Sequence, residues 1–356
     1  MAVGMEIAFF GSSLVSAYWN GAATYYRGII KELAARGHRI TFYEPDIYNR
    51  QDHRDIPDPE WARVFVYPGR PEGMDKAIDD SRRADLLIKA SGVGIYDDLL
   101  EKAVLDIRKP GVKVIFWDVD APATLDRIGR NPNDPFRALV PCYDLILTYG
   151  GGRSVVDAYR SHGARACIPV YNALDPSTHF PAPPENRFSA DLGFLGNRLP
   201  DRESRVDDFF FGPASALPHF HFILGGNGWH DKPRPANVEY LGHVYTRDHN
   251  SFNSSAKAVL NVSRESMARY GYCPATRVFE AAGAGACMIT DEWEGIEMFF
   301  DPGSEIIVAK SGLHVVQKLE ELTHEKARRI GEAARRRVLA EHTYAHRAEE
   351  LDRLLN

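Results

Sequence analysis

The chain of 356 residues is long enough for about two domains of ordinary size. Its content of 44% hydrophobic and 26% charged residues is typical of a soluble globular protein, and its net charge of −6 argues against a nucleic-acid-binding surface. The sequence shows no signal peptide and no apolar run as long as a membrane span, so we expect a cytoplasmic protein. The cysteines lack C-x-x-C pairing and zinc-site spacing, which fits buried thiols in a reducing compartment: Cys142, Cys167, Cys273 and Cys287.

The first half of the chain alternates short apolar runs with helical patterns. Residues 6–10 read as a buried strand, apolar residues at helical spacing follow from Tyr25 to Ala34, and residues 40–43 form the next strand. Strand, helix and strand in this order make a βαβ unit, which implies a parallel sheet. Residues 45–73 read as a surface excursion because they are rich in Pro, Asp and Arg. Further strands are predicted at 85–88, 114–117 and 145–148, with helices near 75–83, 97–108 and 154–162.

The same alternation starts again after the proline-rich segment 180–184. A long helical pattern closes the chain from Glu325 to Leu354, with an interruption expected around His342 and Thr343. We therefore predict an α/β fold of two open parallel sheets, whose ligands bind at the carboxyl ends of the strands in a cleft between the domains. The strands of the second half are predicted at 192–195, 220–224, 238–241, 258–261, 287–290 and 306–308.

The stretch from Pro274 to Ala286 has the strongest functional pattern. It reads as a loop and then a helix with Thr276 as N-cap, followed by a strand. An exposed helix N-terminus binds phosphate, Arg277 adds a guanidinium group, and Glu280 suits the paired hydroxyls of a ribose. This outlines a nucleotide-diphosphate pocket. The alternative, a helix that only packs in the core, is given equal weight here, because Ala/Gly-rich helices with early acidic residues are also common in α/β cores.

Other strand ends in the second half point to the same place. Asn197 and Arg198 follow the first strand, Gly226 follows the second, His243 the third and Arg264 the fourth. Arg198 and Arg264 beside Arg277 would neutralise a diphosphate. Taken singly, each arginine is more often part of a surface ion pair, and a lone histidine such as His243 is more often structural.

In the first half, polar residues also follow strands. Ser12, Asn20 and Gly21 lie between the first strand and its helix, but they do not form a G-x-G-x-x-G fingerprint. Asp118 and Asp120 leave the strand at 114–117 and are candidates for chemistry or for helix capping. The loop around Gly151 either admits a ligand or is a tight turn with Ser154 as N-cap, and the second interpretation is slightly favoured.

Five segments resemble CgeB-type glycosyltransferases, a family named after a spore-maturation protein: residues 115–125, 194–198, 240–244, 274–286 and 341–348. The resemblance implies a GT-B fold, with two Rossmann-like domains whose parallel sheets face each other across a central cleft. It implies an acceptor-side domain over 1–172, a nucleotide-sugar domain over 173–335, and a terminal helix over 336–356 that packs back on the first domain.

The resemblance also implies roles for single residues. Glu280 matches the second glutamate of a Glu-x7-Glu motif and would hold the donor ribose, whereas Tyr272 stands where the first glutamate would be. Arg264 and Arg277 would bind the diphosphate, and Asp118 and Asp120 are candidate catalytic bases if the reaction inverts. The full donor set is Glu280, Arg277, Thr276, Arg264, Tyr272, Asn197, Arg198, His243 and Gly226. The acceptor set is Ser12, Asn20, Gly21 and Gly151.

The implied activity is a hexosyltransferase-like transfer (EC 2.4) from a nucleotide sugar, with UDP as the expected nucleotide and with no cofactor and no metal. The expected partners are the donor and an unidentified acceptor, without nucleic acid. A nucleotide-sugar epimerase or hydrolase, or a non-catalytic bilobal nucleotide-sugar-binding protein, are the alternatives.

Overall fold

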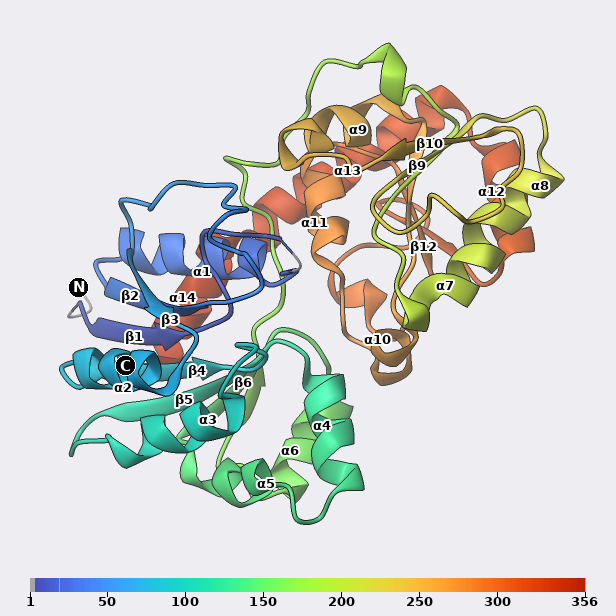
Figure 1. Cartoon of the computed structure of the whole chain (residues 1–356). Helices are drawn as coiled ribbons and strands as arrows, with labels where there is room; N and C mark the ends of the chain where they lie inside the picture. Colours follow the sequence, from blue (N-terminus) through green and yellow to red (C-terminus); the bar gives the residue numbers. More distant parts are fainter. Residues whose placement is uncertain (1–3, 19, 356) are drawn as a thin grey trace. The chain divides into compact units, whose positions relative to one another are not determined.

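The computed structural model describes residues 4–18 and 20–355, which form two compact units. Unit 1 comprises the chain up to Tyr171 together with the segment that begins at Tyr344, and unit 2 comprises Asn172–Thr343 (Figure 1). The sequence placed the first boundary at residue 172 and the start of the terminal segment at residue 336. In the structure the last helix that belongs to unit 1 begins at Tyr344.

Unit 1 contains a seven-stranded parallel sheet in the order β3-β2-β1-β4-β5-β6-β7. The strand order reverses beside β1, which pairs with both β2 and β4. The central strands are apolar along their length and buried, as expected for a sheet covered on both faces. The strands are β1 (Glu6–Phe10), β2 (Arg39–Asp46), β3 (Arg63–Pro68), β4 (Leu86–Ala90), β5 (Lys113–Asp118), β6 (Leu145–Thr148) and β7 (Cys167–Pro169).

The helices of unit 1 connect these strands, and one of them comes from the end of the chain. Helix α14 lies against α1, where Gly28 faces the ring of Tyr344 so closely that an added Cβ would come within 2.1 Å of it. Asp352 of α14 also pairs with Arg36 and His38. The helices are α1 (Ala23–Ala35), α2 (Pro71–Ser81), α3 (Asp97–Asp106), α4 (Ala121–Arg130), α5 (Pro135–Leu139), α6 (Arg153–Ser161) and α14 (Tyr344–Leu355).

Two edge elements of this sheet differ from the sequence prediction. The segment 45–73, predicted as a surface excursion, contains strand β3, and β2 runs on to Asp46. Strand β7 was not predicted either. Both are outer strands with polar or proline residues at their ends, so the hydrophobic run that marks a central strand is short or broken there.

Unit 2 contains a six-stranded parallel sheet in the order β10-β9-β8-β11-β12-β13. Its core is aromatic on one side of β8, where Phe194 contacts the rings of Phe210 and Trp229. All six predicted strands are therefore confirmed within one or two residues. They are β8 (Leu192–Leu195), β9 (Phe222–Gly225), β10 (Val238–Gly242), β11 (Ala258–Asn261), β12 (Met288–Asp291) and β13 (Ile307–Ala309).

The terminal helical pattern is interrupted at His342 and Thr343, as predicted, so that α13 ends in unit 2 and α14 begins in unit 1. None of the helices in the described part of the chain is long and apolar enough to cross a membrane. The helices of unit 2 are α7 (Pro200–Val206), a π-helical turn at Asp207–Phe211, α8 (Gly212–Ala216), α9 (His249–Ser255), α10 (Glu265–Tyr270), α11 (Thr276–Gly283), α12 (Gly312–Glu321) and α13 (His324–Glu341).

Candidate functional site

Two arginines meet at the carboxyl end of β8 in unit 2. A Cβ added to Gly196 would lie 2.9 Å from Nη2 of Arg277 and 3.0 Å from Nη2 of Arg202, so both guanidinium groups contact this backbone. Both also lie over the ring of Phe194, at 5.5 Å and 5.6 Å from its centroid. Because Gly196 has no side chain, the guanidinium groups of Arg202 and Arg277 both fit at the end of β8.

These two cations are poorly compensated. Nη1 of Arg277 and Nε of Arg202 are buried without a hydrogen-bond partner within the described residues. Burial and the nearby charge of Arg277 lower the pKa of Arg202 to about 9. Burial also lowers the pKa of Arg277, against the opposing effect of Glu280. An anion placed between the two side chains would supply the missing negative charge and the missing acceptors.

Helix α11 begins beside these arginines, and its N-terminus is not capped by a side chain. The N-cap is Ala275, not Thr276 as predicted, and alanine has no group that can accept from the first turn. Thr276 is the first helical residue, and its hydroxyl donates to Asn172 Oδ1 at 3.2 Å. An uncapped helix start favours an anion nearby, because its backbone N–H groups carry partial positive charge.

The loops after β8 and β9 hold Gly196 in position. Asn197 Oδ1 accepts from the backbone N–H of Asn227 at 2.9 Å, and Trp229 Nε1 donates to the carbonyl oxygen of Gly196 at 2.7 Å. Gly226 has φ of 122°, and a Cβ there would come within 2.3 Å of the same carbonyl oxygen. Asn197 and Gly226, both predicted to bind the donor, therefore shape the loops in this structure.

Two other predicted donor ligands are engaged in ion pairs. Arg198 pairs with Glu203 at 2.7 Å and with Asp231 at 3.0 Å, so its charge is already compensated in this structure and its role at the diphosphate stays a prediction. Arg264 pairs with Asp201 at 2.7 Å. Arg202 stands where Arg198 was expected, and sequence reasoning did not assign it a role. The available signal was its place in the first turn of the helix that follows the glycine loop.

Glu280 lies one turn after Arg277 on α11, next to two histidines. Its Oε1 is 3.8 Å from Nε2 of His179, whose side chain is 4% exposed. His249, at the start of α9, joins them, since one nitrogen of each ring and a Glu280 oxygen lie within 4.8 Å of one another. Burial lowers the pKa of His249, against the opposing charge of Glu280. Neither histidine was singled out from the sequence, because 70 residues separate them.

The remaining donor candidates lie at the surface of their loops. Tyr272 has φ of 49°, its N–H donates to the carbonyl oxygen of Glu294 at 2.6 Å, and its ring packs on Gly295. His243 is exposed, and its ring meets that of Tyr245 edge-on at 4.7 Å. The structure therefore gives Tyr272 a role in loop packing and leaves His243 accessible.

In unit 1, the two candidate bases have different surroundings. Asp118 is fully buried and accepts hydrogen bonds from Ser91 Oγ at 2.7 Å, from Thr124 Oγ1 at 3.0 Å, and from the Tyr159 hydroxyl and the Asp120 N–H. With four donors and no exposure, Asp118 holds together the strand end around it in this structure, and its catalytic role stays a prediction. Asp120 is half-buried at the N-cap of α4 and makes no capping bond through its side chain.

The predicted acceptor residues mostly stabilise their own loops. Ser12 Oγ donates to Asn20 Oδ1 at 2.9 Å, and the Asn20 amide donates to the carbonyl oxygens of Ser13 and Ser16. Gly151, with φ of 91°, makes the tight turn that was the favoured interpretation, although the N-cap of α6 is Gly152 and not Ser154. Gly21 is exposed, and the space around the position of a Cβ is open.

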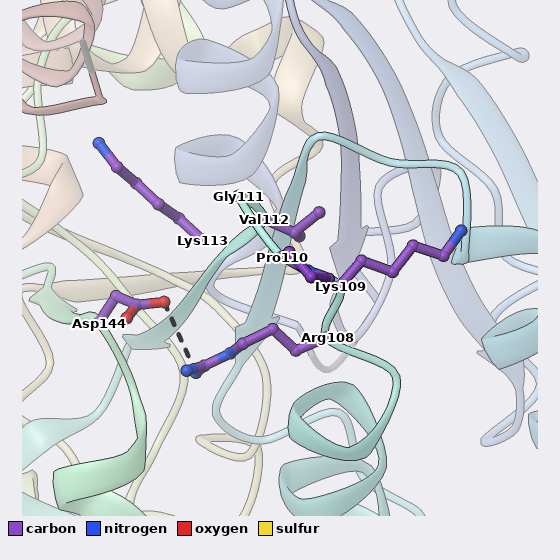
Figure 2. A pocket seen from close by; sticks show the side chains of 7 residues that line it. All are labelled: Arg108, Lys109, Pro110, Gly111, Val112, Lys113 and Asp144. Atoms are coloured by element: carbon purple, nitrogen blue, oxygen red, sulfur yellow. Dashed lines mark ion pairs between the residues drawn. The ribbon is translucent and has the colours of Figure 1, made fainter.

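A pocket of about 490 Å³ lies elsewhere in unit 1 (Figure 2). It surrounds the turn into β5 and the start of β6, at the amino edge of the sheet. Its lining includes Arg108, which lies 3.5 Å from Asp144, and it does not include any predicted site residue. The lining residues are Arg108, Lys109, Pro110, Gly111, Val112, Lys113 and Asp144.

Comparison with solved structures identifies the architecture. A sucrose-phosphate synthase from Thermosynechococcus elongatus matches with a TM-score of 0.69 and 12% identity over 98% of both chains. Anabaena Alr3699/HepE, solved in complex with UDP-glucose, matches with a TM-score of 0.68 and 13% identity over 99% of both chains. The chain has the GT-B fold. T4 phage BGT, solved in complex with its UDP-glucose substrate, also matches, with a TM-score of 0.62 and 14% identity over 98% of both chains.

The predicted fold is thereby confirmed, with one Rossmann-like parallel sheet in each unit of the GT-B chain. A sequence family described as "Glycosyl transferase-like" matches residues 202–353, a range that includes Arg202, Arg277 and Glu280. No curated protein matches the chain.

Proposed function

We propose that this protein is a glycosyltransferase that takes its sugar from a nucleotide-diphosphate donor. The observation that carries the proposal is the pair Arg202 and Arg277 beside the uncapped start of α11, since one buried nitrogen of each, Nε of Arg202 and Nη1 of Arg277, lacks a hydrogen-bond partner within the described residues. A diphosphate offers the negative charge and the acceptor oxygens that this arrangement requires. The match of the surrounding residues to a glycosyl transferase-like family supports the same assignment.

The arginines would act on the leaving group. As the bond between the sugar and the diphosphate breaks, negative charge grows on the phosphate oxygen. Two guanidinium groups and a helix N-terminus, already in position, stabilise that charge without reorganisation, which lowers the barrier. We propose that this step needs no metal ion at the diphosphate. Glu280, one helical turn further along α11, would accept from the ribose hydroxyls.

The donor is proposed to be a UDP-hexose. HepE and T4 phage BGT, which share the fold, are described as complexes with UDP-glucose. The CgeB-type relationship belongs to the same proposal and rests on the sequence segments that resemble that family. Asp120 is the proposed base for an inverting reaction, since it is the less buried of the two strand-end carboxylates.

The proposal is tested by thermal unfolding with a panel of nucleoside diphosphates and their sugars. A ligand at one hundred times its dissociation constant stabilises by about 2.7 kcal/mol, which raises Tm by roughly 5–10 °C for a unit of this size. We expect such a shift with UDP or a UDP-sugar, and its loss in Arg202→Ala and Arg277→Ala. Arg198→Ala is the matched control, because that arginine lies on the same loop but pairs with Glu203 and Asp231.

A folded protein that shows no shift with any nucleotide would contradict the proposal. Equal loss in the Arg198→Ala control would contradict the assignment of the site to the other two arginines. If binding is found, release of UDP from the donor in the presence of an acceptor panel separates a transferase from a binding protein.

A further inference from the structure

The cluster of His179, His249 and Glu280 in unit 2 has a composition that the proposed diphosphate site does not explain. One ring nitrogen of each histidine and one carboxylate oxygen of Glu280 lie within 4.8 Å of one another. The side chains of His179 and Glu280 are only 4% and 17% exposed. Three polar groups that meet in a mostly buried place require compensation.

The hydrogen bonds of His249 determine which of its nitrogens carries the proton. Its Nε2 lies 3.3 Å from the carbonyl oxygen of Val244. A carbonyl oxygen can only accept, so Nε2 must be the N–H nitrogen of the neutral ring. Nδ1 then presents a lone pair.

The same reasoning applies to His179 through Thr178. The hydroxyl of Thr178 donates to the carbonyl oxygen of Asp175 at 3.1 Å, which uses its one hydrogen. This hydroxyl also lies 2.9 Å from Nδ1 of His179, and with its hydrogen on Asp175 it accepts there from a protonated Nδ1. The lone pair of His179 is therefore on Nε2, the nitrogen that lies 3.8 Å from Glu280 Oε1.

The backbone around the cluster keeps both rings in place. The side chain of Asn250, the residue after His249, donates to the carbonyl oxygen of Thr178 at 2.9 Å and accepts from the N–H of Phe180 at 3.3 Å. These two bonds bracket His179 and tie it to the start of α9. The hydrogen bonds of Asn250 to the backbone on either side of His179 thus hold the two histidines near each other.

We propose that His179, His249 and Glu280 form a binding site for a divalent transition-metal ion of the zinc class. Two imidazoles and a carboxylate are a common zinc ligand set, and they leave a fourth position for water or another ligand. Each ring also makes a hydrogen bond to an oxygen, His179 with Thr178 and His249 with Val244, and bonds of this kind orient metal-binding histidines. A cation would also offset the negative charge that Glu280 brings into this mostly buried cluster.

The geometry requires a modest closure around the ion. Tetrahedral ligands at about 2.0–2.1 Å from zinc are about 3.3 Å apart. The 3.8 Å between His179 Nε2 and Glu280 Oε1 is near this value, and the three ligand atoms, which lie within 4.8 Å of one another, would have to draw closer when the ion binds. Glu280 is also the proposed ribose ligand, so zinc is expected to compete with the nucleotide. This last consequence rests on the proposed function, whereas the site itself does not.

The test uses the full-length protein, without a histidine tag and treated with a chelator, titrated with zinc in a calorimeter and with Co²⁺ by visible absorption. We expect one equivalent of zinc to bind and Co²⁺ to give the absorption of a tetrahedral site. His179→Gln and His249→Gln each weaken zinc binding at least about tenfold, as loss of a ligand should. His243→Gln, at an exposed histidine near the same loops, leaves it unchanged.

Each result decides the proposal. Absence of zinc binding, or binding unchanged in His179→Gln and His249→Gln, overturns it. If those variants weaken UDP binding while zinc does not bind at all, the three acceptors serve the ribose hydroxyls and the metal site is wrong. If zinc binds through these residues but no nucleotide binds, the metal site stands and the proposed function falls. If zinc and UDP each bind, but saturating zinc leaves the affinity for UDP unchanged, the expected competition is wrong.

Discussion

Arg202 and Arg277 place two positive charges on one glycine of unit 2, and neither forms an ion pair within the described residues. Such an arrangement costs stability in the ligand-free protein, because each charge is partly desolvated and repels the other. The proposed diphosphate would offset this cost when it binds. Stability and binding should therefore respond in opposite directions when one charge is removed.

Replacement Arg202→Met tests this opposition. Methionine fills similar space over Phe194 without a charge, so we expect the free energy of unfolding to rise by about 1–3 kcal/mol in the absence of nucleotide. Nucleotide affinity should fall at least about tenfold, since a charge-assisted hydrogen bond is lost. Urea unfolding and calorimetric titration measure the two effects. A variant that is both less stable and weaker in binding would show that Arg202 is merely structural.

Glu101 in α3 makes the stability of unit 1 depend on pH. Burial raises the pKa of its carboxyl from 4.5 to about 7, while Lys89 and Arg127 oppose the shift and Asp97 and Asp98 add to it. The folded chain therefore holds this proton more tightly than the unfolded chain. The stabilisation is complete below pH 4.5 and is lost as the pH rises through 7.

The free energy of unfolding of the wild type should fall between pH 5 and pH 8. In Glu101→Gln we expect this fall to be smaller by about 1–3 kcal/mol, because the amide does not titrate. Urea unfolding across this pH range measures the difference. Asp106→Asn, at an exposed carboxylate on the same helix that is not among the groups shifting this pKa, serves as the control and should keep the wild-type profile. An unchanged profile in Glu101→Gln would assign the pH dependence to another group.

The pair Asp118 and Asp120 separates a structural carboxylate from a candidate base. In Asp118→Asn, the amide N–H₂ faces hydroxyl and N–H groups that themselves donate, so the free energy of unfolding should fall by about 2 kcal/mol. The protein that remains folded should keep the wild-type kcat. Asp120→Asn should change stability by less than about 0.5 kcal/mol and lower kcat about a hundredfold or more. Thermal unfolding and a UDP-release assay distinguish them. Full activity in Asp120→Asn would remove it as the base.

At the scale of elements, the loops after β8 and β9 depend on one close backbone approach. Gly226→Ala would press a methyl group against the carbonyl oxygen of Gly196, and its φ of 122° is unfavourable for any side chain. We expect the free energy of unfolding to fall by about 2–4 kcal/mol. Nucleotide binding should also weaken, because the guanidinium groups of both arginines lie against Gly196. Gly242→Ala is the matched control. Its φ is also positive, at 70°, but the space around it is open, so it should cost about 1 kcal/mol.

The elements also show what sequence patterns can and cannot predict. The central strands were predicted because buried parallel strands read as continuous apolar runs, and β1, β6, β8 and β11 match residue for residue. The outer strand β3 was missed among proline and charged residues. For the site, the start of α11 gave Arg277 and Glu280, since a phosphate-binding helix start has a local pattern. Arg202 had only one local signal, its place in the first turn of the helix after the glycine loop, and the two histidines are brought together only by folding.

At the scale of the whole molecule, unit 1 is completed by the last helix of the described chain. Gly28→Ala should improve the helix propensity of α1, yet its Cβ would overlap the ring of Tyr344 on α14. We expect a net destabilisation of about 1–3 kcal/mol, with faster hydrogen exchange in α1 and α14 and no change in residues 192–309. Gly129→Ala in α4, with open space around it, should instead stabilise by up to about 1 kcal/mol. Faster exchange throughout both units would contradict this picture.

The return of the chain to unit 1 at Tyr344 has a consequence for synthesis on the ribosome. Domains commonly fold in the order in which they are made, at about 5–20 residues per second. Here unit 1 is begun first but is finished last, because residues 172–343 must all be made before α14 emerges. That interval is about 10–30 s. During it, the face of α1 that carries Gly28 has no partner, so unit 2 is the first part of the nascent protein able to complete its native structure.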